Sequence, residues 1–174
     1  MPSDTFADLA RGQVSSIAAN EELEELLGIS DDPADDLEII RDRIMPGSCQ
    51  WILRRQSFLD WVDVGSHDSR ILWLTGLPAV GKSVLSSFII DHLQKDSSIQ
   101  NCYYYFFKSE NQSKRTVGQM LRSLAFQVAK SIPSFRARLV ELYHTGVLSL
   151  GRQKVNTIWE TIFEGVLLDR KSVV

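Results

Sequence analysis

The sequence lacks the marks of a secreted or membrane-spanning protein. No apolar run approaches the roughly 18 residues that a membrane-spanning helix needs. The first ten residues, MPSDTFADLA, have neither a basic start nor a long apolar core, so they do not resemble a signal peptide. The only two cysteines, Cys49 and Cys102, are isolated thiols that suit a reducing compartment. We therefore predict a cytoplasmic protein with no membrane partner.

The sequence also lacks a basic tract with interleaved aromatic residues, which argues against nucleic-acid binding. The net charge of −3 nevertheless hides an uneven distribution. Residues 1–45 carry twelve acidic and three basic side chains, whereas residues 46–174 carry ten acidic and sixteen basic ones. We predict an acidic, mostly helical leader over residues 1–45 and one domain over residues 46–174. The leader is either solvated or folded against the basic body.

What the sequence does contain is a phosphate-binding pattern within residues 70–93, RILWLTGLPAVGKSVLSSFIIDHL. Residues 76–83 match G-x-x-x-x-G-K-[ST], the P-loop or Walker A pattern. The short apolar run at residues 71–74 predicts a strand before the motif, and apolar residues at helical spacing predict a helix over residues 84–93. The predicted nucleotide-binding residues are Gly76, Leu77, Pro78, Ala79, Val80, Gly81, Lys82 and Ser83.

Each specified position of this pattern has a physical role in holding a nucleotide. Gly76 and Gly81 permit backbone angles and a close approach that a side chain would obstruct. Backbone N–H groups and the positive end of the following helix then face an anion-sized hollow. Lys82 is predicted to reach the β- and γ-phosphates, and the hydroxyl of Ser83 is predicted to bind Mg²⁺. ATP, or another nucleoside triphosphate, with Mg²⁺ is therefore the expected cofactor.

The remaining pattern predicts an α/β fold. The aromatic run CYYYFF at residues 102–107 has strand length and suits a strand that is covered on both faces, as in a parallel sheet. Two strands joined through the P-loop helix form a βαβ unit. Further helices are predicted over residues 5–27, 33–44, 48–64, 117–128, 133–143 and 154–169.

Hydrolysis requires a second Mg²⁺-binding carboxylate at the end of another strand, the Walker B position. Two candidates are weak: Asp91 lies inside the P-loop helix, and Asp169 follows an apolar run that continues a helical stripe. Arg115 and Arg122 are candidates for contacting phosphate, but lone arginines are more often surface residues. The three histidines, His67, His92 and His144, have no partner at metal-binding spacing and are interpreted as solvated or packing residues.

Four segments together resemble the NACHT-type (STAND) P-loop NTPase domain of fungal NOD-like receptor proteins and the similar nephrocystin-like N-terminal domains. These segments are CQWILRRQSFLDWV, RILWLTGLPAVGKSVLSSFIIDHL, YYYFFKSENQSKRTVGQMLRSLAFQV and NTIWETIFEGVL, and the resemblance covers about residues 45–168. It implies a three-layer αβα fold and an ATPase switch that acts in signal transduction and fungal innate immunity. The Walker B strand of that family would follow the last segment, so the chain is expected to be a P-loop NTPase fragment that ends before it.

The expected function is therefore nucleotide binding in a signalling switch, with poor or no hydrolysis by this chain. Two alternatives remain open. A small P-loop kinase would need an acceptor site and an arginine-rich lid. A non-enzymatic interaction module would pair its acidic leader or an exposed apolar edge with a second copy or with a full-length relative.

Overall fold

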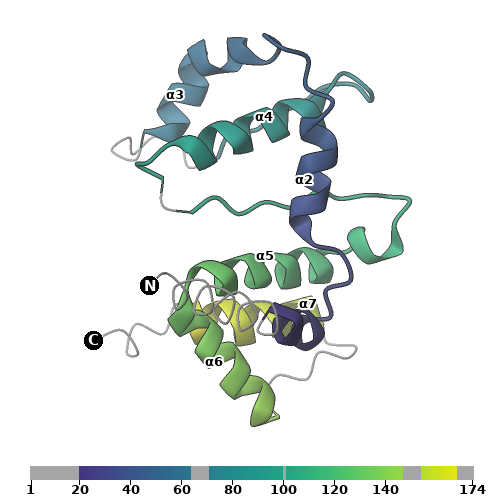
Figure 1. The fold of residues 1–174 in the computed structure, drawn as a ribbon, viewed down its shortest axis with the longest axis vertical. Coiled ribbons are helices and arrows are strands. Elements are labelled where there is room, and N and C mark those ends of the chain that lie inside the picture. The colour runs from purple at the N-terminus through teal and green to yellow at the C-terminus, as the bar shows by residue number, and fades with distance from the viewer. Residues whose placement is uncertain (1–19, 64–70, 100, 147–153, 168–174) are drawn as a thin grey trace, which may run out of the picture. The chain divides into compact units, whose positions relative to one another are not determined.

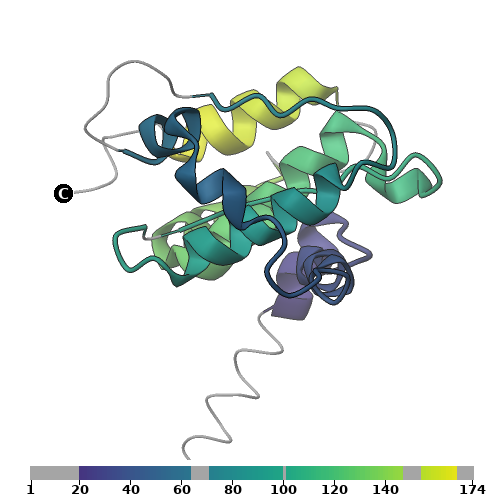
Figure 2. The same cartoon turned by 90° about the horizontal axis from the view of Figure 1, so that it is seen from above.

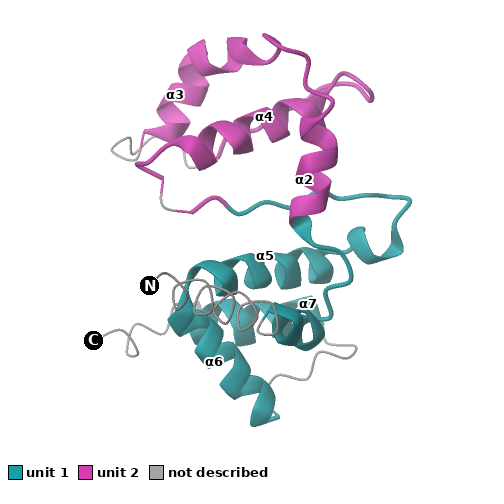
Figure 3. Cartoon of the chain, viewed as in Figure 1, with its two compact units in different colours: residues 1–33, 103–174 teal, residues 34–102 magenta. Residues whose placement is uncertain are grey.

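The computed structural model describes residues 20–63, 71–99, 101–146 and 154–167 (Figure 1). The chain divides into two compact units, which Figure 3 distinguishes by colour. Unit 1 combines residues 1–33 with residues 103–174, and unit 2 comprises residues 34–102. This division concerns packing, and the sequence boundary predicted at residue 45 stays a prediction.

Unit 2 is built from short helices around one longer helix. Its elements are α2 (Pro33–Arg41), whose first residue belongs to unit 1, the 3₁₀ helix η1 (Gln50–Arg54), α3 (Gln56–Val62) and α4 (Lys82–Lys95). Helices α3 and α4 lie side by side in both views (Figures 1 and 2). Ile52 of η1 and Phe58 of α3 pack against Ile89 and Leu93 of α4. These four buried residues form the core of this unit.

Helix α4 is also fixed to α2 by charge. Asp91, in the last turns of α4, forms an ion pair with Arg41 at 2.9 Å and another with Lys95 one turn further along. Lys95 also lies in the last turn, where a positive side chain interacts favourably with the negative end of the helix dipole. These contacts place the carboxylate of Asp91 at the end of α4 that lies away from the P-loop.

Unit 1 is a helical cluster with its own core. It contains a helix over residues 20–27, the 3₁₀ helix η2 (Gln112–Lys114), α5 (Val117–Ser131), α6 (Pro133–His144), α7 (Val155–Ile158) and the π-helix η3 (Trp159–Leu167). Helix α5 contacts α6, α7 and η3. The buried core residues are Leu23, Leu26, Leu27, Leu121, Ala125, Phe126, Val128, Ala129, Phe135, Leu139, Ile158, Ile162 and Phe163.

Two predicted helix starts are explained by their first residues. Thr116 precedes α5, and its hydroxyl accepts a hydrogen bond from the backbone N–H of Gln119 at 3.2 Å. This side chain satisfies one of the N–H groups that a helix start leaves unpaired. Pro133 opens α6, where its fixed φ angle suits a helix and its missing N–H costs nothing.

The predicted α/β class and three-layer αβα architecture are wrong for this structure. Within the described residues there is no β-strand and therefore no sheet. Residues 71–77 and 101–108 are extended or irregular rather than paired in a ladder. The physical reason is that helices form their hydrogen bonds locally, whereas a strand exists only beside a neighbour that supplies the opposite row of donors and acceptors.

One of these extended segments is held by a side chain instead of a strand. The Gln127 amide of α5 donates to the carbonyl oxygen of Tyr104 at 2.8 Å and accepts from its N–H at 3.2 Å. Rings two residues apart pack together on this segment, Tyr104 with Phe106 and Tyr105 with Phe107, as alternation along extended backbone dictates. The strand predicted over residues 102–107 is therefore absent, and this segment is held by side-chain contacts with α5 instead of a ladder.

Candidate functional site

The P-loop pattern forms a tight turn that leads directly into α4. Residues 78–81 turn, and α4 begins at Lys82. Ala79 and Gly81 both have left-handed backbone angles, with φ of 64° and 87°. Glycine adopts this region without the steric cost that a Cβ brings, which explains Gly81 at the entry to the helix.

Lys82 folds back over this turn. Its Nζ donates hydrogen bonds to the carbonyl oxygens of Gly76 at 2.9 Å and Leu77 at 2.7 Å. These two contacts hold the ammonium group above the turn while the side chain stays exposed. A Cβ added to Gly76 would meet Val80 Cγ2 at 3.0 Å, so any larger residue there would force the Val80 side chain to shift.

The backbone N–H groups at the start of α4 donate no hydrogen bond to the side chain of a capping residue. Gly81 occupies the cap position, and among the described residues no side chain makes a capping hydrogen bond there. The first N–H groups of a helix have no carbonyl partner within it, and the helix dipole places partial positive charge there. With the Lys82 ammonium beside it, this turn has the chemistry of an anion site.

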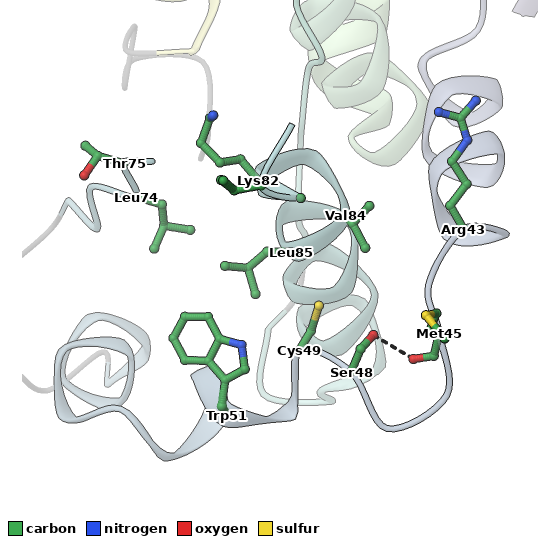
Figure 4. A pocket seen from close by; sticks show the side chains of 12 residues that line it. Arg43, Met45, Ser48, Cys49, Trp51, Leu74, Thr75, Lys82, Val84 and Leu85 are labelled. Carbon is green, nitrogen blue, oxygen red and sulfur yellow. Dashed lines mark hydrogen bonds between the residues drawn. The ribbon is translucent and has the colours of Figure 1, made fainter. Parts of the chain in front are cut away.

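A cavity of about 440 Å³ opens beside the turn (Figure 4). It is lined by Arg43, Met45, Ser48, Cys49, Trp51, Leu74, Thr75, Val80, Gly81, Lys82, Val84 and Leu85. All of these residues belong to unit 2. Figure 4 shows the cations Lys82 and Arg43 toward one end and Trp51 toward the other, below Leu74 and Leu85.

The sequence profile of the family described as "Nephrocystin 3, N-terminal" matches residues 47–173, which include the whole P-loop. The chain belongs to this family. The match confirms the resemblance to nephrocystin-like N-terminal domains. Among curated proteins, the vegetative incompatibility protein HET-E-1 of Podospora anserina is 26% identical over 134 residues. That alignment covers 76% of this chain but 10% of the relative. No solved structure matches the chain.

The structure places the other predicted site residues as follows. Ser83 is exposed in the first turn of α4. The carboxylate of Asp91 forms ion pairs with Arg41 and Lys95. Asp91 follows Lys82 by nine positions, which corresponds to about 13 Å along a helix. Asp169 and His67 lie outside the described residues.

Neither predicted arginine lies in the unit that carries the P-loop. Arg115 and Arg122 belong to unit 1, and burial lowers the pKa of Arg122. The ring of His92 lies 6.3 Å from that of Phe58, and the ring of His144 lies 5.8 Å from that of Tyr143. The described residues contain no group of three or more His, Cys, Asp or Glu side chains that suits a metal ion. Nor does the described part of the chain contain a helix with the length and apolar character needed to cross a membrane.

The sequence alone did not reveal the far wall of the cavity. Arg43, Cys49 and Trp51 precede the P-loop by 25 positions or more, and they reach it because η1 packs beside α4. Cys49 and Trp51 belong to the segment CQWILRRQSFLDWV, which contributed to the family resemblance without indicating a ligand contact, and Arg43 precedes that segment.

Proposed function

We propose that this chain binds a nucleoside triphosphate, with Mg²⁺, through residues 76–83. The observation that carries the proposal is the fold of the octet: a glycine turn at the uncapped start of α4, with the Lys82 ammonium held over it by two carbonyl oxygens. A Cβ placed on Gly81 would find nothing within 4 Å, so the space in front of the helix start is open. These residues fit an anionic phosphate chain.

The residues have distinct roles in this proposal. The N–H groups at the start of α4 donate to phosphate oxygens. Lys82 exchanges its carbonyl partners for the β- and γ-phosphates, which are charged acceptors and therefore bind the ammonium more strongly. The exposed hydroxyl of Ser83 is the chain's candidate Mg²⁺ ligand. When bound, the ion neutralises phosphate charge and orients the triphosphate.

A signalling role is the proposed context for this binding. It is supported by membership of the nephrocystin 3 N-terminal family and by similarity to a vegetative incompatibility protein, of which this chain spans about 10% of the length. We expect slow hydrolysis or none from this chain. No Asp or Glu lines the cavity among the described residues, and Asp91 already pairs with two cations.

The test is a titration of the purified chain with a fluorescent ATP analogue in the presence of Mg²⁺. We expect Lys82→Ala to weaken binding at least about tenfold, because charged hydrogen bonds contribute roughly 1.5–3 kcal/mol and 1.4 kcal/mol is tenfold in affinity. Lys95→Ala is the matched control, since it removes the same charge from the other end of α4. Equal affinities for the wild type and Lys82→Ala would rule the proposal out.

A second candidate function, self-association, rests on exposed apolar side chains. Ile71, Trp73 and Leu77 are 76%, 79% and 76% exposed on the segment before the turn. Large apolar groups gathered on a surface favour protein contacts. Light scattering over a range of concentrations tests this role: Trp73→Ser should lower the mean mass if the segment joins two copies, and a monomer at every concentration would exclude it.

A further inference from the structure

We propose that two copies of this chain exchange their leader helices, so that residues 20–27 of each copy dock on unit 1 of the other. The leader helix (residues 20–27) and the hinge that follows it (residues 28–32) belong to unit 1. Along the chain, unit 2 separates them from the rest of unit 1 (Figure 3). The proposal concerns a different part of the chain from the P-loop and goes beyond nucleotide binding.

The first argument is that the leader helix covers a surface that the family domain builds without it. Leu23, Leu26 and Leu27 are 0–2% exposed, and their spacing of i, i+3 and i+4 is that of a helix anchored on an apolar surface. They share one core with residues of α5, α6, α7 and η3, which all lie within the matched residues 47–173. The leader helix lies outside that match. These four helices therefore form a docking face, and the leader helix is its ligand.

The second argument is the construction of the hinge. Gly28 ends the leader helix in the left-handed conformation, with φ of 61°, and the exposed residues Ser30 and Asp31 follow. Pro33 begins α2, and a proline disfavours the helical conformation for the residue before it, which is Asp32 here. An extended hinge over residues 28–32 spans about 17 Å. It is therefore long enough to carry the leader helix onto a second copy.

The third argument is charge complementarity between the two parts of the chain. A carboxylate oxygen of Asp32 lies 3.4 Å from Nζ of Lys130 in α5, and one of Asp31 lies 3.9 Å from Nζ of the buried Lys114. With three basic and twelve acidic side chains, residues 1–45 have a net charge of −9, whereas residues 46–174 have sixteen basic and ten acidic ones and a net charge of +6. The leader of one copy is therefore attracted to the body of another and repelled by its leader.

The energetics favour a reciprocal exchange. An exchanged dimer contains the same contacts between leader helix and docking face as two monomers, so only the hinge and the protein concentration distinguish the two states. Exchange of an identical element is for this reason a low-cost route to a dimer. Each docking face receives one leader helix, and the pair closes without an empty face. We expect monomers in dilute solution and exchanged dimers in concentrated solution.

The experiment mixes two charge variants, Asp32→Lys and Lys130→Asp, in the absence of nucleotide. In either variant alone, like charges face each other at this contact in the monomer and also in its own exchanged dimer. In a mixed dimer with exchanged leader helices, both contacts are ion pairs again. The equimolar mixture is equilibrated at high concentration in urea below the unfolding midpoint, so that leader helices detach, and is returned to buffer for native mass spectrometry.

We expect the mixed dimer to exceed either single-variant dimer by at least about tenfold. Two like-charge contacts become two attractive ones, and each change contributes a modest amount at these partly exposed positions. The effect of Asp32→Lys on the start of α2 is common to monomers and dimers, so it does not alter this comparison. Thermal denaturation of each variant shows whether it is folded.

The matched control mixes Lys130→Asp with Glu25→Lys. Glu25 is an exposed acidic residue of the leader helix, whereas the ion pair of Lys130 is formed with Asp32. This mixture reverses the same kinds of charge without restoring the lost ion pair, so it should show no such excess of the mixed dimer. Trp73→Ser, which tests the other self-association surface, should leave the result of the first mixture unaltered when it is added to both variants.

The hinge provides a second variant, which keeps every residue of the docking face. Insertion of a short Gly-Ser segment after Ser30 lengthens the hinge and eases the return of the leader helix to its own copy. The dimer fraction at a given concentration should therefore fall several-fold below that of the wild type. The same insertion after Ser97, in the exposed loop that follows α4, is the control and should leave the dimer fraction unchanged.

The outcomes are distinct. Mixed and single-variant dimers in statistical proportions would overturn the proposal, since dimers would then form without exchange of leader helices. Monomers alone, in the mixture and in the concentrated wild type, would show that the leader helix stays on its own copy and would also overturn it. Because no nucleotide is present, failure of the exchange leaves the nucleotide proposal standing, and failure of nucleotide binding leaves the exchange standing.

Discussion

Gly81 has the most demanding backbone position at the site. Its φ of 87° lies in the left-handed region, where a Cβ costs roughly 1–2 kcal/mol, although no atom lies within 4 Å of the added carbon. Gly81→Ala should therefore lower the free energy of unfolding by about 1–2 kcal/mol through strain alone. Urea denaturation followed by circular dichroism would measure it, and an unchanged midpoint would contradict the assigned backbone conformation.

Gly118 provides the contrasting case at the same scale. It lies in α5, and a Cβ there would meet Ile158 Cδ1 at 3.6 Å, an ordinary contact. Gly118→Ala should raise the free energy of unfolding by about 0.5–1 kcal/mol, because alanine is the better helix former. The same denaturation experiment measures the change, and a loss of stability would show that the helix start or its packing differs from this account.

At the scale of elements, the Gln127 side chain forms the backbone hydrogen bonds of Tyr104 that a neighbouring strand would otherwise form. Gln127→Ala removes both hydrogen bonds from the amide to the Tyr104 backbone. We expect a loss of roughly 1–3 kcal/mol in the free energy of unfolding, the cost of removing partners from partly buried polar groups. Gln112→Ala, an exposed glutamine in η2, is the control and should change stability little. Equal stability of both variants would show that the amide contacts contribute nothing.

The helices could be predicted from the sequence, whereas the strands could not. Helix α5 was predicted from its own periodicity, because the apolar spacing along a helix is a local property. The strands were predicted from equally local patterns, but pairing depends on distant residues, and the prediction failed there. The P-loop turn was found by its motif, whereas Trp51 could not be, since only the packing of η1 near α4 brings it to the turn.

At the scale of the whole molecule, part of the acidic leader is a structural component of unit 1. Leu23, Leu26 and Leu27 are 0–2% exposed and share one core with α5, α6 and η3. Asp32, just beyond them, pairs with Lys130 of α5 at 3.4 Å, and Asp31 lies 3.9 Å from the buried Lys114. Of the two readings of the leader, packing against the body therefore holds for these residues.

This packing predicts a large effect from a leader substitution. Leu27→Ala should lower the free energy of unfolding by about 2–5 kcal/mol, the usual cost of deleting a fully buried leucine side chain. Glu25→Ala, an exposed position on the same helix, should have little effect. Chemical denaturation of both variants provides the comparison. A Leu27→Ala chain as stable as the wild type would mean that the leader does not belong to the core.

The central claim is that the turn at residues 76–83 and the start of α4 hold the phosphates of a nucleotide. Hydrogen–deuterium exchange of the chain with and without saturating Mg-ATP tests it most directly, since it reports on the backbone N–H groups themselves. We predict slower exchange in the peptides that cover residues 76–85, and less slowing in Lys82→Ala than in the wild type at an ATP concentration near the Kd of the wild type. Exchange over residues 76–85 that ATP leaves unchanged in the wild type would contradict the account.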